Sequence, residues 1–344
     1  MSKADMIVDL QYGSTGKGLI AGYLAVVRKY DTVITANMPN AGHTFIDTMG
    51  NKMVHKVLPN GVVSPRCKWA LIGPGAVFDL DQLLDELNHL KNIGYDHFKV
   101  GIHPNAVLLK TAHKLSEKNN VSIGSTMQGS GAALIEKIQR DPKKVTIIGQ
   151  FYALNSGIMY NSKSLNNIVV LSHDEYRHII EDSLSILLEG AQGFSLGINE
   201  RFYPYCTSRD CTPARFMADM GIPLPMLREV IGTARTYPIR VGNPPGGYSG
   251  SCYNDQMEIK WSDIGIEPEL TTVTKRERRL FSFSFKQIRD AMWAMAPDSV
   301  FLNFCNYCKN NPTQLELIES AFKGKIVWKG WGPSVDDIKE IKHG

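Results

Sequence analysis

The stretch that decides the fold is residues 9–19, DLQYGSTGKGL. It follows an apolar run at Met6–Leu10, which predicts a β-strand, and it leads into Lys17–Lys29, which predicts a helix. Three glycines in the stretch let backbone N–H groups approach an anion closely, and Lys17 adds a positive charge beside the N-terminal end of the helix. The stretch therefore predicts a phosphate-binding loop between a strand and a helix.

This loop departs from the Walker A pattern at two positions. That pattern requires glycine where the chain has Gln11, and serine or threonine where it has Gly18. The loop also carries no carboxylate between its glycines, where Ser14 stands. A tight strand-to-helix turn with an ordinary surface lysine is the alternative interpretation.

Apolar runs of strand length alternate with helix-like segments along the chain. Strands are predicted at Met6–Leu10, Thr32–Thr35, His43–Asp47, Met53–Leu58, Trp69–Ile72, Ser185–Leu188, Arg228–Ala234, Val300–Phe304 and Lys325–Trp328. Helices are predicted at Lys17–Lys29, at the leucine-spaced segment 80–90, after the capping box that begins at Ser172 and as far as Asp182, at Phe285–Met295 and at Gln314–Ala321. The alternation indicates an α/β fold on a mostly parallel sheet, and we expect a single large domain over residues 1–344.

Composition limits the class of protein. The chain has 344 residues, 43% of them hydrophobic, and a formal net charge of +4. Its positive residues are spread out, no apolar run approaches the roughly 20 residues of a membrane span, and the N-terminus lacks the apolar core of a signal peptide. We therefore expect a cytosolic protein, in the host cytoplasm if it is viral, that binds neither nucleic acid nor membrane. The lone CxxC of Cys305 and Cys308 predicts free thiols in preference to a metal or redox site.

Several predicted strands end directly in glycine-containing or polar loops. Besides the loop after Leu10, these are EGAQG at 189–193, NFCN at 303–306 and KGWGP at 329–333. Ligands bind at the carboxyl ends of strands in open α/β sheets, so we expect one shared site. His43, in the glycine-containing segment NAGHT, is a general-acid candidate there because its pKa lies near neutrality, although a lone histidine is more often structural.

Together, the phosphate loop and NAGHT resemble adenylosuccinate synthetase, whose glycine loop has the form QWGDEGKGK. Counterparts of other family motifs follow in order, namely LPNG at 58–61, IGST at 123–126, EGAQG at 189–193, YPYCT at 203–207, RVG at 240–242 and GWGP at 330–333. The resemblance covers nearly the whole chain. It implies an adenylosuccinate-synthetase-like fold with a P-loop-like phosphate site.

The resemblance also implies a reaction, in which a nucleoside triphosphate phosphorylates O6 of a purine nucleotide and the amine of L-aspartate then displaces the phosphate. It implies that Ser14, His43 and Lys17 are catalytic, with His43 as the general acid, and that Mg²⁺ is held by Ser14 and Gly42. The triphosphate-binding residues that it implies are Ser14, Thr15, Gly16, Lys17, Gly18, Gly42, His43, Thr44, Asn303, Asn306, Gly330 and Pro333. The implied acceptor-binding residues are Ser14, Asn40, Ser125, Thr126, Arg140, Gln192, Thr207, Val241 and Gly242.

Arginines carry the remaining implied contacts. Arg140 matches a family arginine that reaches the nucleotide of the partner subunit, which implies a homodimer, although by itself it is typical of a solvated helix end. The run Lys275–Arg279 is by itself typical of a solvated basic face. It aligns with the aspartate-binding loop of the family, in which Thr274, Arg276 and Arg278 would hold L-aspartate.

Two departures from the family indicate the substrates. The family has an aspartate at the position of Ser14, where it takes the purine N1 proton; serine is neutral and smaller, and it leaves room for a 2-amino group beside N1. This favours guanine, as in the phage-type members that act on dGMP, and the alternative is a divergent adenylosuccinate synthetase. At Asn306 the family has an aspartate that reads the guanine of GTP, whereas an amide pairs with adenine, which predicts ATP or dATP.

The sequence thus predicts a ligase that makes N6-succino-2-amino-2′-deoxyadenylate from dGMP, L-aspartate and ATP or dATP through a 6-phosphoryl intermediate. This product feeds the synthesis of 2-aminoadenine for DNA. One alternative is an ordinary adenylosuccinate synthetase that uses IMP. Another is a catalytically silent nucleotide-binding regulator, which has no need of His43 or of the Lys275–Arg279 run.

Overall fold

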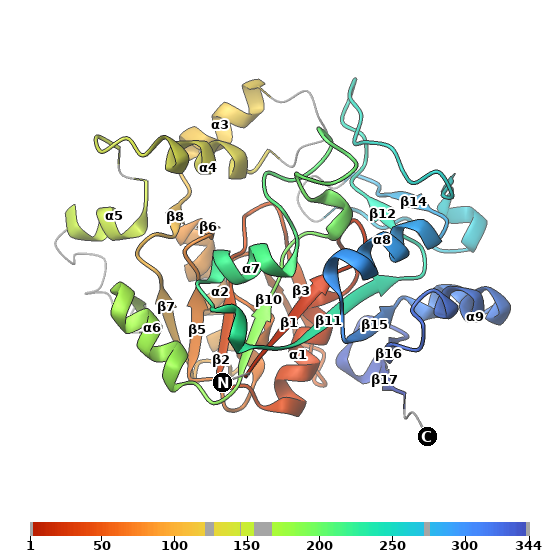
Figure 1. Ribbon diagram of the computed structural model, residues 1–344, viewed down its shortest axis with the longest axis horizontal. Coiled ribbons are helices and arrows are strands. Elements are labelled where there is room, and N and C mark those ends of the chain that lie inside the picture. The colour runs from red at the N-terminus through yellow and green to blue at the C-terminus, as the bar shows by residue number, and fades with distance from the viewer. Residues whose placement is uncertain (1–2, 121–126, 145, 155–166, 272–275, 342–344) are drawn as a thin grey trace.

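A ten-stranded sheet forms the centre of the molecule. The computed structural model describes residues 3–120, 127–144, 146–154, 167–271 and 276–341 (Figure 1). The order of the strands across the sheet is β17-β16-β15-β11-β1-β10-β2-β5-β7-β9. Their bounds are β1 Ala4–Asp9, β2 Thr32–Thr35, β5 Trp69–Ile72, β7 Lys99–Ile102, β9 Ile168–Val170, β10 Ile186–Glu189, β11 Leu227–Arg235, β15 Ser299–Asn303, β16 Ile326–Gly330 and β17 Ile338–Glu340. All neighbours are parallel except β16 and β17, so the predicted α/β fold on a mostly parallel sheet is confirmed.

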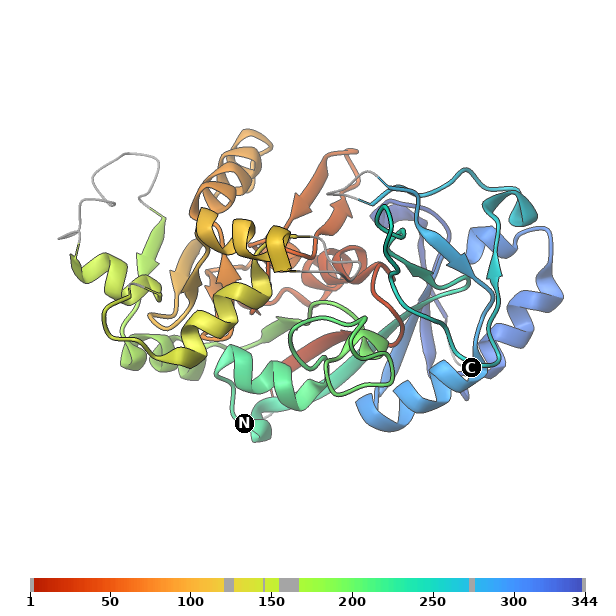
Figure 2. The same cartoon turned by 90° about the horizontal axis from the view of Figure 1, so that it is seen from above.

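Helices cover the sheet along its length. They are α1 Lys17–Arg28, α2 Leu80–Asn92, α3 Thr111–Asn120, α4 Ser130–Gln139, α5 Ile148–Leu154, α6 His173–Asp182, α7 Pro213–Met220, α8 Phe285–Met295 and α9 Pro312–Ser320. Figure 2 shows the segments around α5 and α6, in yellow-green, at one end of the molecule and α8 and α9, in blue, at the other. Among the described residues, no helix is both long enough and apolar enough to cross a membrane.

Smaller elements complete the fold. A hairpin joins β3 His43–Ile46 to β4 Lys52–His55, and β12 Ile239–Arg240, β14 Arg279–Phe281 and β13 Glu258–Ile259 form a three-stranded sheet. The remaining strands, β6 Val77–Phe78 and β8 Val107–Leu108, pair with each other. Short 3-10 helices include η1 Asn60–Val63 and η7 Cys305–Cys308.

Local sequence signals set several of these boundaries. Ser172 accepts a hydrogen bond from the backbone N–H of Glu175, whose side chain accepts one from the backbone N–H of Ser172, so the predicted capping box of α6 is confirmed. Asp47 fixes the turn of the β3–β4 hairpin by accepting the backbone N–H groups of Met49 and Asn51. The sequence prediction omitted β6, β7, β8, β9, β17, the three-stranded sheet and helices α3, α4, α5 and α7.

The strand order places β1 at the middle of the sheet, and all six of its residues are buried. Because β16, β15, β11, β1, β10 and β2 are adjacent and parallel, their carboxyl ends meet along one edge of the sheet, which we call the carboxyl edge. The loops after β1, β10, β15 and β16, which the sequence predicted to converge, all leave from this edge.

Candidate functional site

The loop between β1 and α1 folds around the carboxylate of Asp9. Its Oδ1 accepts the backbone N–H groups of Gln11, at 2.9 Å, and Gly13, at 3.1 Å. Its Oδ2 accepts hydrogen bonds from the Thr15 hydroxyl and from Nζ of Lys17, the latter at 2.9 Å. Asp9 is 1% exposed, so these bonds fix the loop from inside. Sequence reasoning missed Asp9 because it looked for a carboxylate only between the glycines.

Lys17 is not a surface lysine, because it is only 5% exposed. Its Nζ donates to the backbone carbonyl of Gln192 at 2.7 Å as well as to Asp9. The lysine therefore joins the phosphate loop to the loop that follows β10. In this arrangement the charge of Lys17 is balanced by Asp9 at the base of the loop.

Asn303, the last residue of β15, packs between the phosphate loop and the end of β16. Its Nδ2 donates to the Thr15 carbonyl at 3.4 Å, and its Oδ1 accepts the backbone N–H of Phe304 at 2.8 Å. A Cβ atom on Gly16 would lie 2.1 Å from Nδ2 of Asn303, and one on Gly330 would lie 2.1 Å from its Oδ1. Both glycines are thus required by the space that this one buried amide fills.

His43, at the start of β3, is buried beside the carboxylate of Glu189 at the end of β10. The distance from its Nδ1 to Oε2 of Glu189 is 3.7 Å. Burial lowers the pKa of His43 and Lys17 lowers it further, while Glu189 acts in the opposite direction. The imidazole is therefore neutral near pH 7 and carries one N–H that it can donate to an anionic oxygen.

Glu189 also supports the segment that covers the start of α1. Its two carboxylate oxygens accept the backbone N–H groups of Asn60, at 3.0 Å, and Gly61, at 2.6 Å. Asn60 in turn lies against the first turn of α1, where a Cβ atom on Gly18 would be 2.1 Å from its Nδ2. Sequence reasoning placed Glu189 in the EGAQG motif but gave it no role, since its partners lie more than a hundred residues away.

Buried side-chain polar atoms without hydrogen-bond partners gather at the carboxyl edge. Within the part of the chain that the structure describes, they include both side-chain polar atoms of Asn37 and Asn60, both ring nitrogens of His43, Oδ1 of Asn40 and Nε2 of Gln192. Buried polar groups are normally paired, so a group of unpaired ones in one region indicates a site for a polar ligand. Asn37, which follows β2, was not among the sequence-predicted residues.

The acceptor-binding residues predicted from the resemblance lie partly together. Nδ2 of Asn40 donates to the Thr207 hydroxyl at 3.3 Å, and Gln192 adopts a left-handed backbone with φ of 64° next to Lys17. Ser14 is exposed, with φ of 57°. Gly42 and Thr44 are exposed beside His43.

Gly242 brings the predicted acceptor and aspartate residues into contact. A Cβ atom there would lie 2.3 Å from the carbonyl oxygen of Glu277 and 3.2 Å from Cβ of Arg276. Arg276 and Arg278 are half-buried, and the backbone N–H of Arg276 donates to the Thr271 hydroxyl at 3.0 Å. Val241 is half-buried immediately before Gly242.

Other predicted residues lie apart from this group or outside the described chain. Arg140 is exposed at the C-cap of α4 with a left-handed φ of 54°, so it ends a helix as the sequence predicted. Asn306 is half-buried on η7 and Pro333 is exposed after β16, both beyond the carboxyl edge. Ser125, Thr126 and Thr274 lie outside the described residues.

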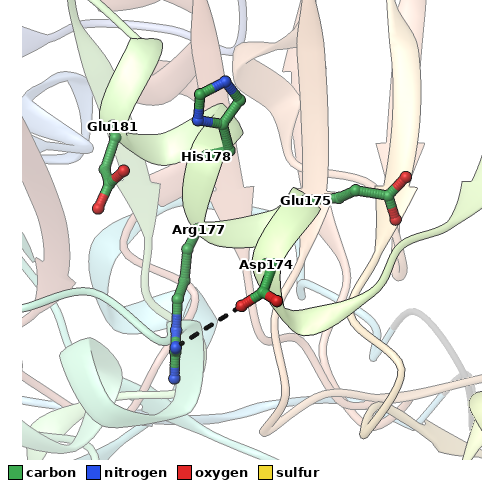
Figure 3. Close-up of a pocket in the computed structure, with 5 residues that line it drawn as sticks. All are labelled: Asp174, Glu175, Arg177, His178 and Glu181. Atoms are coloured by element: carbon green, nitrogen blue, oxygen red, sulfur yellow. Dashed lines mark ion pairs between the residues drawn. The ribbon is translucent and has the colours of Figure 1, made fainter.

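A shallow hollow on α6 is not part of this site. It is lined by Asp174, Glu175, Arg177, His178 and Glu181, and Figure 3 shows them all on this one helix. Nη1 of Arg177 lies 4.0 Å from Oδ1 of Asp174, and the two side chains are 72% and 96% exposed. Such a pair is typical of a solvated helix face.

Comparison with known proteins identifies the family of the chain. A family model described as adenylosuccinate synthetase matches residues 6–160 and 143–313. The N6-succino-2-amino-2′-deoxyadenylate synthase of Vibrio phage phiVC8 is 51% identical over 348 residues, which span 98% of this chain and 98% of that protein. The structure of succinoaminodeoxyadenylate synthetase from cyanophage S-2L, bound to dGMP and to dATP as an energy donor, matches with a TM-score of 0.90 and 37% identity over 100% of this chain and 96% of that one. Fully ligated adenylosuccinate synthetase from Plasmodium falciparum shares the fold, with a TM-score of 0.78 at 19% identity over 99% of this chain and 100% of that one.

Proposed function

The chain belongs to the adenylosuccinate synthetase family, and we propose that it is the ligase that condenses dGMP with L-aspartate to give N6-succino-2-amino-2′-deoxyadenylate. The reaction consumes one ATP or dATP and releases the nucleoside diphosphate and inorganic phosphate. The observation that carries this proposal is Ser14, which is exposed at the turn of the phosphate loop. The rest of the loop is held by the Asp9 carboxylate, which accepts hydrogen bonds from Gln11 and Lys17. A serine at this position accommodates the 2-amino group of guanine, which the family aspartate would meet.

His43 and the loop amides supply the phosphoryl-transfer chemistry. In the first step O6 of the purine attacks the γ-phosphorus of the donor, and negative charge is carried by the transferring oxygens. A neutral His43 donates its N–H to one of these oxygens, and Glu189 beside Nδ1 stabilises the positive charge that the ring gains if it is protonated. In the second step the aspartate amine attacks C6, and phosphate leaves with the O6 oxygen.

Members of this family generally use Mg²⁺, and the residues present fit a weakly held ion. No group of three or more histidine, cysteine, aspartate or glutamate side chains suited to a metal occurs among the described residues, and Asp9 is fully used by four donors. We infer that Ser14 and Gly42, which are exposed residues, would hold the ion through the serine hydroxyl and the glycine carbonyl, together with substrate phosphate oxygens. When bound, Mg²⁺ would neutralise phosphate charge.

The donor and the assembly are parts of the same proposal. The cyanophage relative was solved with dATP as an energy donor, and Asn306 supplies an amide that pairs with adenine; both support ATP or dATP as the donor here. We propose a homodimer in which Arg140, exposed at the end of α4, reaches the nucleotide of the partner subunit. Residues 1–344 act as one catalytic domain, and the aspartate carboxylates are held by Thr274, Arg276 and Arg278.

The test is product formation with two acceptors side by side. Purified protein is mixed with L-aspartate, ATP, Mg²⁺ and either dGMP or IMP, and the succinyl product is identified by mass spectrometry. We expect product from dGMP. Product from IMP alone would assign an ordinary adenylosuccinate synthetase instead, and tight triphosphate binding without turnover of either acceptor would assign a regulator.

A further inference from the structure

Arg235, the last residue of β11, is a fully buried arginine at the carboxyl edge. Its Nη2 lies 2.5 Å from Oε1 of Glu269 and its Nη1 lies 3.3 Å from Oε2, so the two side chains form a bidentate ion pair. The guanidinium also lies 3.8 Å from the centroid of the Phe304 ring. The backbone of Arg235 is held in place by the Gln11 side chain, which both donates to and accepts from it.

Arg235 and Glu269 form hydrogen bonds with three other segments: the phosphate loop, η7 and the segment that contains Arg278. Nη1 of Arg235 donates to the Ser14 carbonyl of the phosphate loop at 3.2 Å. Oε1 of Glu269 accepts the hydroxyl of Tyr307 at 2.9 Å, and Tyr307 is the neighbour of Asn306 on η7. The backbone carbonyl of Glu269 accepts the N–H of Arg278 at 2.8 Å.

The charges of Arg235, Glu269 and Arg278 affect one another. Arg235 lowers the pKa of Glu269 by its charge and its hydrogen bonds, in opposition to burial. Burial lowers the pKa of Arg278, and Glu269 opposes that effect. The guanidinium of Arg278 makes no hydrogen bond with any residue that the structure describes, so its donors are available, and the geometric link to Glu269 is the backbone hydrogen bond.

We propose that Arg235 and Glu269 are positioning residues that link the donor-base segment, Phe304–Tyr307, to the aspartate-binding arginines. Arg235 has no exposed surface and acts through its neighbours. A single ion pair therefore sets the position of two segments that are to bind different substrates. This inference rests on the proposed function, because it names what those two segments bind.

Substitutions at Glu269 test the link. Glu269→Gln removes the charge that neutralises Arg235 and Arg278, and we expect the KM values for ATP and for L-aspartate both to rise roughly tenfold. The KM for dGMP should change less than these two, since Ser14 is the one proposed acceptor residue to which the pair is shown to bond, through its backbone carbonyl. Glu269→Asp keeps the carboxylate and should recover part of both losses. Tyr307→Phe, which removes one hydrogen bond, is a milder second variant in case Glu269→Gln fails to fold, and both KM values should rise about threefold.

The matched control is Arg28→Gln. Arg28 forms an ion pair of 2.6 Å with Glu229 at the amino ends of the strands, so its loss should lower the melting temperature without changing either KM. The proposal is overturned if Glu269→Gln behaves like this control, or if only one of the two KM values rises. If the wild-type protein makes no product from dGMP, the proposed function has failed. The pair is then tested by calorimetric binding of ATP and of L-aspartate, where weaker binding of both supports the link and unchanged affinities overturn it.

Discussion

His43 Nδ1 lies 3.7 Å from Oε2 of Glu189, and that carboxylate is also the acceptor for the backbone N–H groups of Asn60 and Gly61. One buried carboxylate thus both orients the candidate general acid and holds the segment that packs on the start of α1. A histidine beside such a group can remain neutral when the site is empty and gain a proton as phosphoryl charge accumulates nearby.

Glu189→Gln is expected to lower kcat roughly a hundredfold, because the amide provides no charge to stabilise a protonated His43. It should also lower the free energy of unfolding by about 1–3 kcal/mol, because the amide has one acceptor oxygen and its NH2 group faces the other backbone N–H donor. Steady-state kinetics and urea unfolding measure the two effects.

Glu86→Gln is the control that separates them. Glu86 is also a buried glutamate, and it accepts the backbone N–H groups of Lys56, Val57 and Leu58 in the same stretch of chain, whereas the carboxylate beside His43 is that of Glu189. Its variant should lose stability and keep kcat. Equal kcat values for the two variants would show that Glu189 has only a structural role.

Ser14→Asp is expected to lower kcat/KM for dGMP at least about tenfold, because the carboxylate occupies the space beside N1 that a 2-amino group requires. The backbone does not oppose this change, since Ser14 has φ of 57° and aspartate tolerates the left-handed region better than most residues. Parallel assays with dGMP and IMP give the comparison. Undiminished turnover of dGMP would refute the steric role of Ser14.

The sequence predicted the parts of the fold that are encoded locally. Thr32–Thr35, Trp69–Ile72 and Phe285–Met295 form the predicted elements with the predicted bounds, because each is a complete apolar run or periodic segment. The strand Lys99–Ile102 was missed, since its four residues include a lysine and a glycine and it is paired only by tertiary context.

The site likewise contains residues that the sequence predicted and residues that it did not. His43 and Lys17 stand in recognisable motifs, and the structure places both at the carboxyl edge. Arg235 and Glu269 belong to no motif and are separated by 34 residues in the sequence. They come into contact because Arg235 ends β11 and Glu269 lies beside Tyr307 of η7. No periodicity or spacing encodes such a contact, so it became visible only in three dimensions.

Asn306→Asp is expected to change the preferred donor from an adenine to a guanine nucleotide. A carboxylate only accepts hydrogen bonds, so it suits the N–H groups of guanine and repels the acceptor N1 of adenine. The ratio of kcat/KM for ATP to that for GTP should fall at least about tenfold. Asn311→Asp is the control, because Asn311 caps α9 by accepting the backbone N–H of Gln314 and is not one of the proposed donor-binding residues; the ratio should not change.

His103 is expected to make stability depend on pH. Its Nδ1 accepts the backbone N–H of Asn105, which requires a neutral ring, and burial together with the charges of His173, Lys137 and Arg177 lowers its pKa to about 4. Above about pH 6.5 the ring is neutral in both the folded and unfolded chains, so this contribution to stability is fully present. As the pH falls from about 6.5 towards 4, only the unfolded chain binds the proton, and the free energy of unfolding falls by at most about 1.4 kcal/mol per pH unit from this group.

His103→Asn removes the titration and can keep the hydrogen bond, since asparagine accepts the N–H two residues ahead. Urea unfolding is measured between about pH 4.5 and 7 in roughly half-unit steps. The free energy of unfolding of this variant should depend less on pH than that of the wild-type protein. Identical profiles for His103→Asn and the wild-type protein would contradict the assignment.

Gly330→Ala is expected to lower the free energy of unfolding by about 1–3 kcal/mol, because its methyl group meets the Asn303 amide in a fully packed region. Asn303→Ala should remove part of that penalty in the double variant, because the added atom would still lie 2.9 Å from Cζ of Phe301, and it costs stability by itself. Gly324→Ala is the matched control: this glycine has φ of 76° and nothing within 4 Å of the added atom, so its cost comes from backbone strain. That cost should not respond to Asn303→Ala, since the two sites share no contact. A double-mutant cycle with no coupling between Gly330 and Asn303 would show that β16 moves aside and that the Asn303 amide does not make Gly330 necessary.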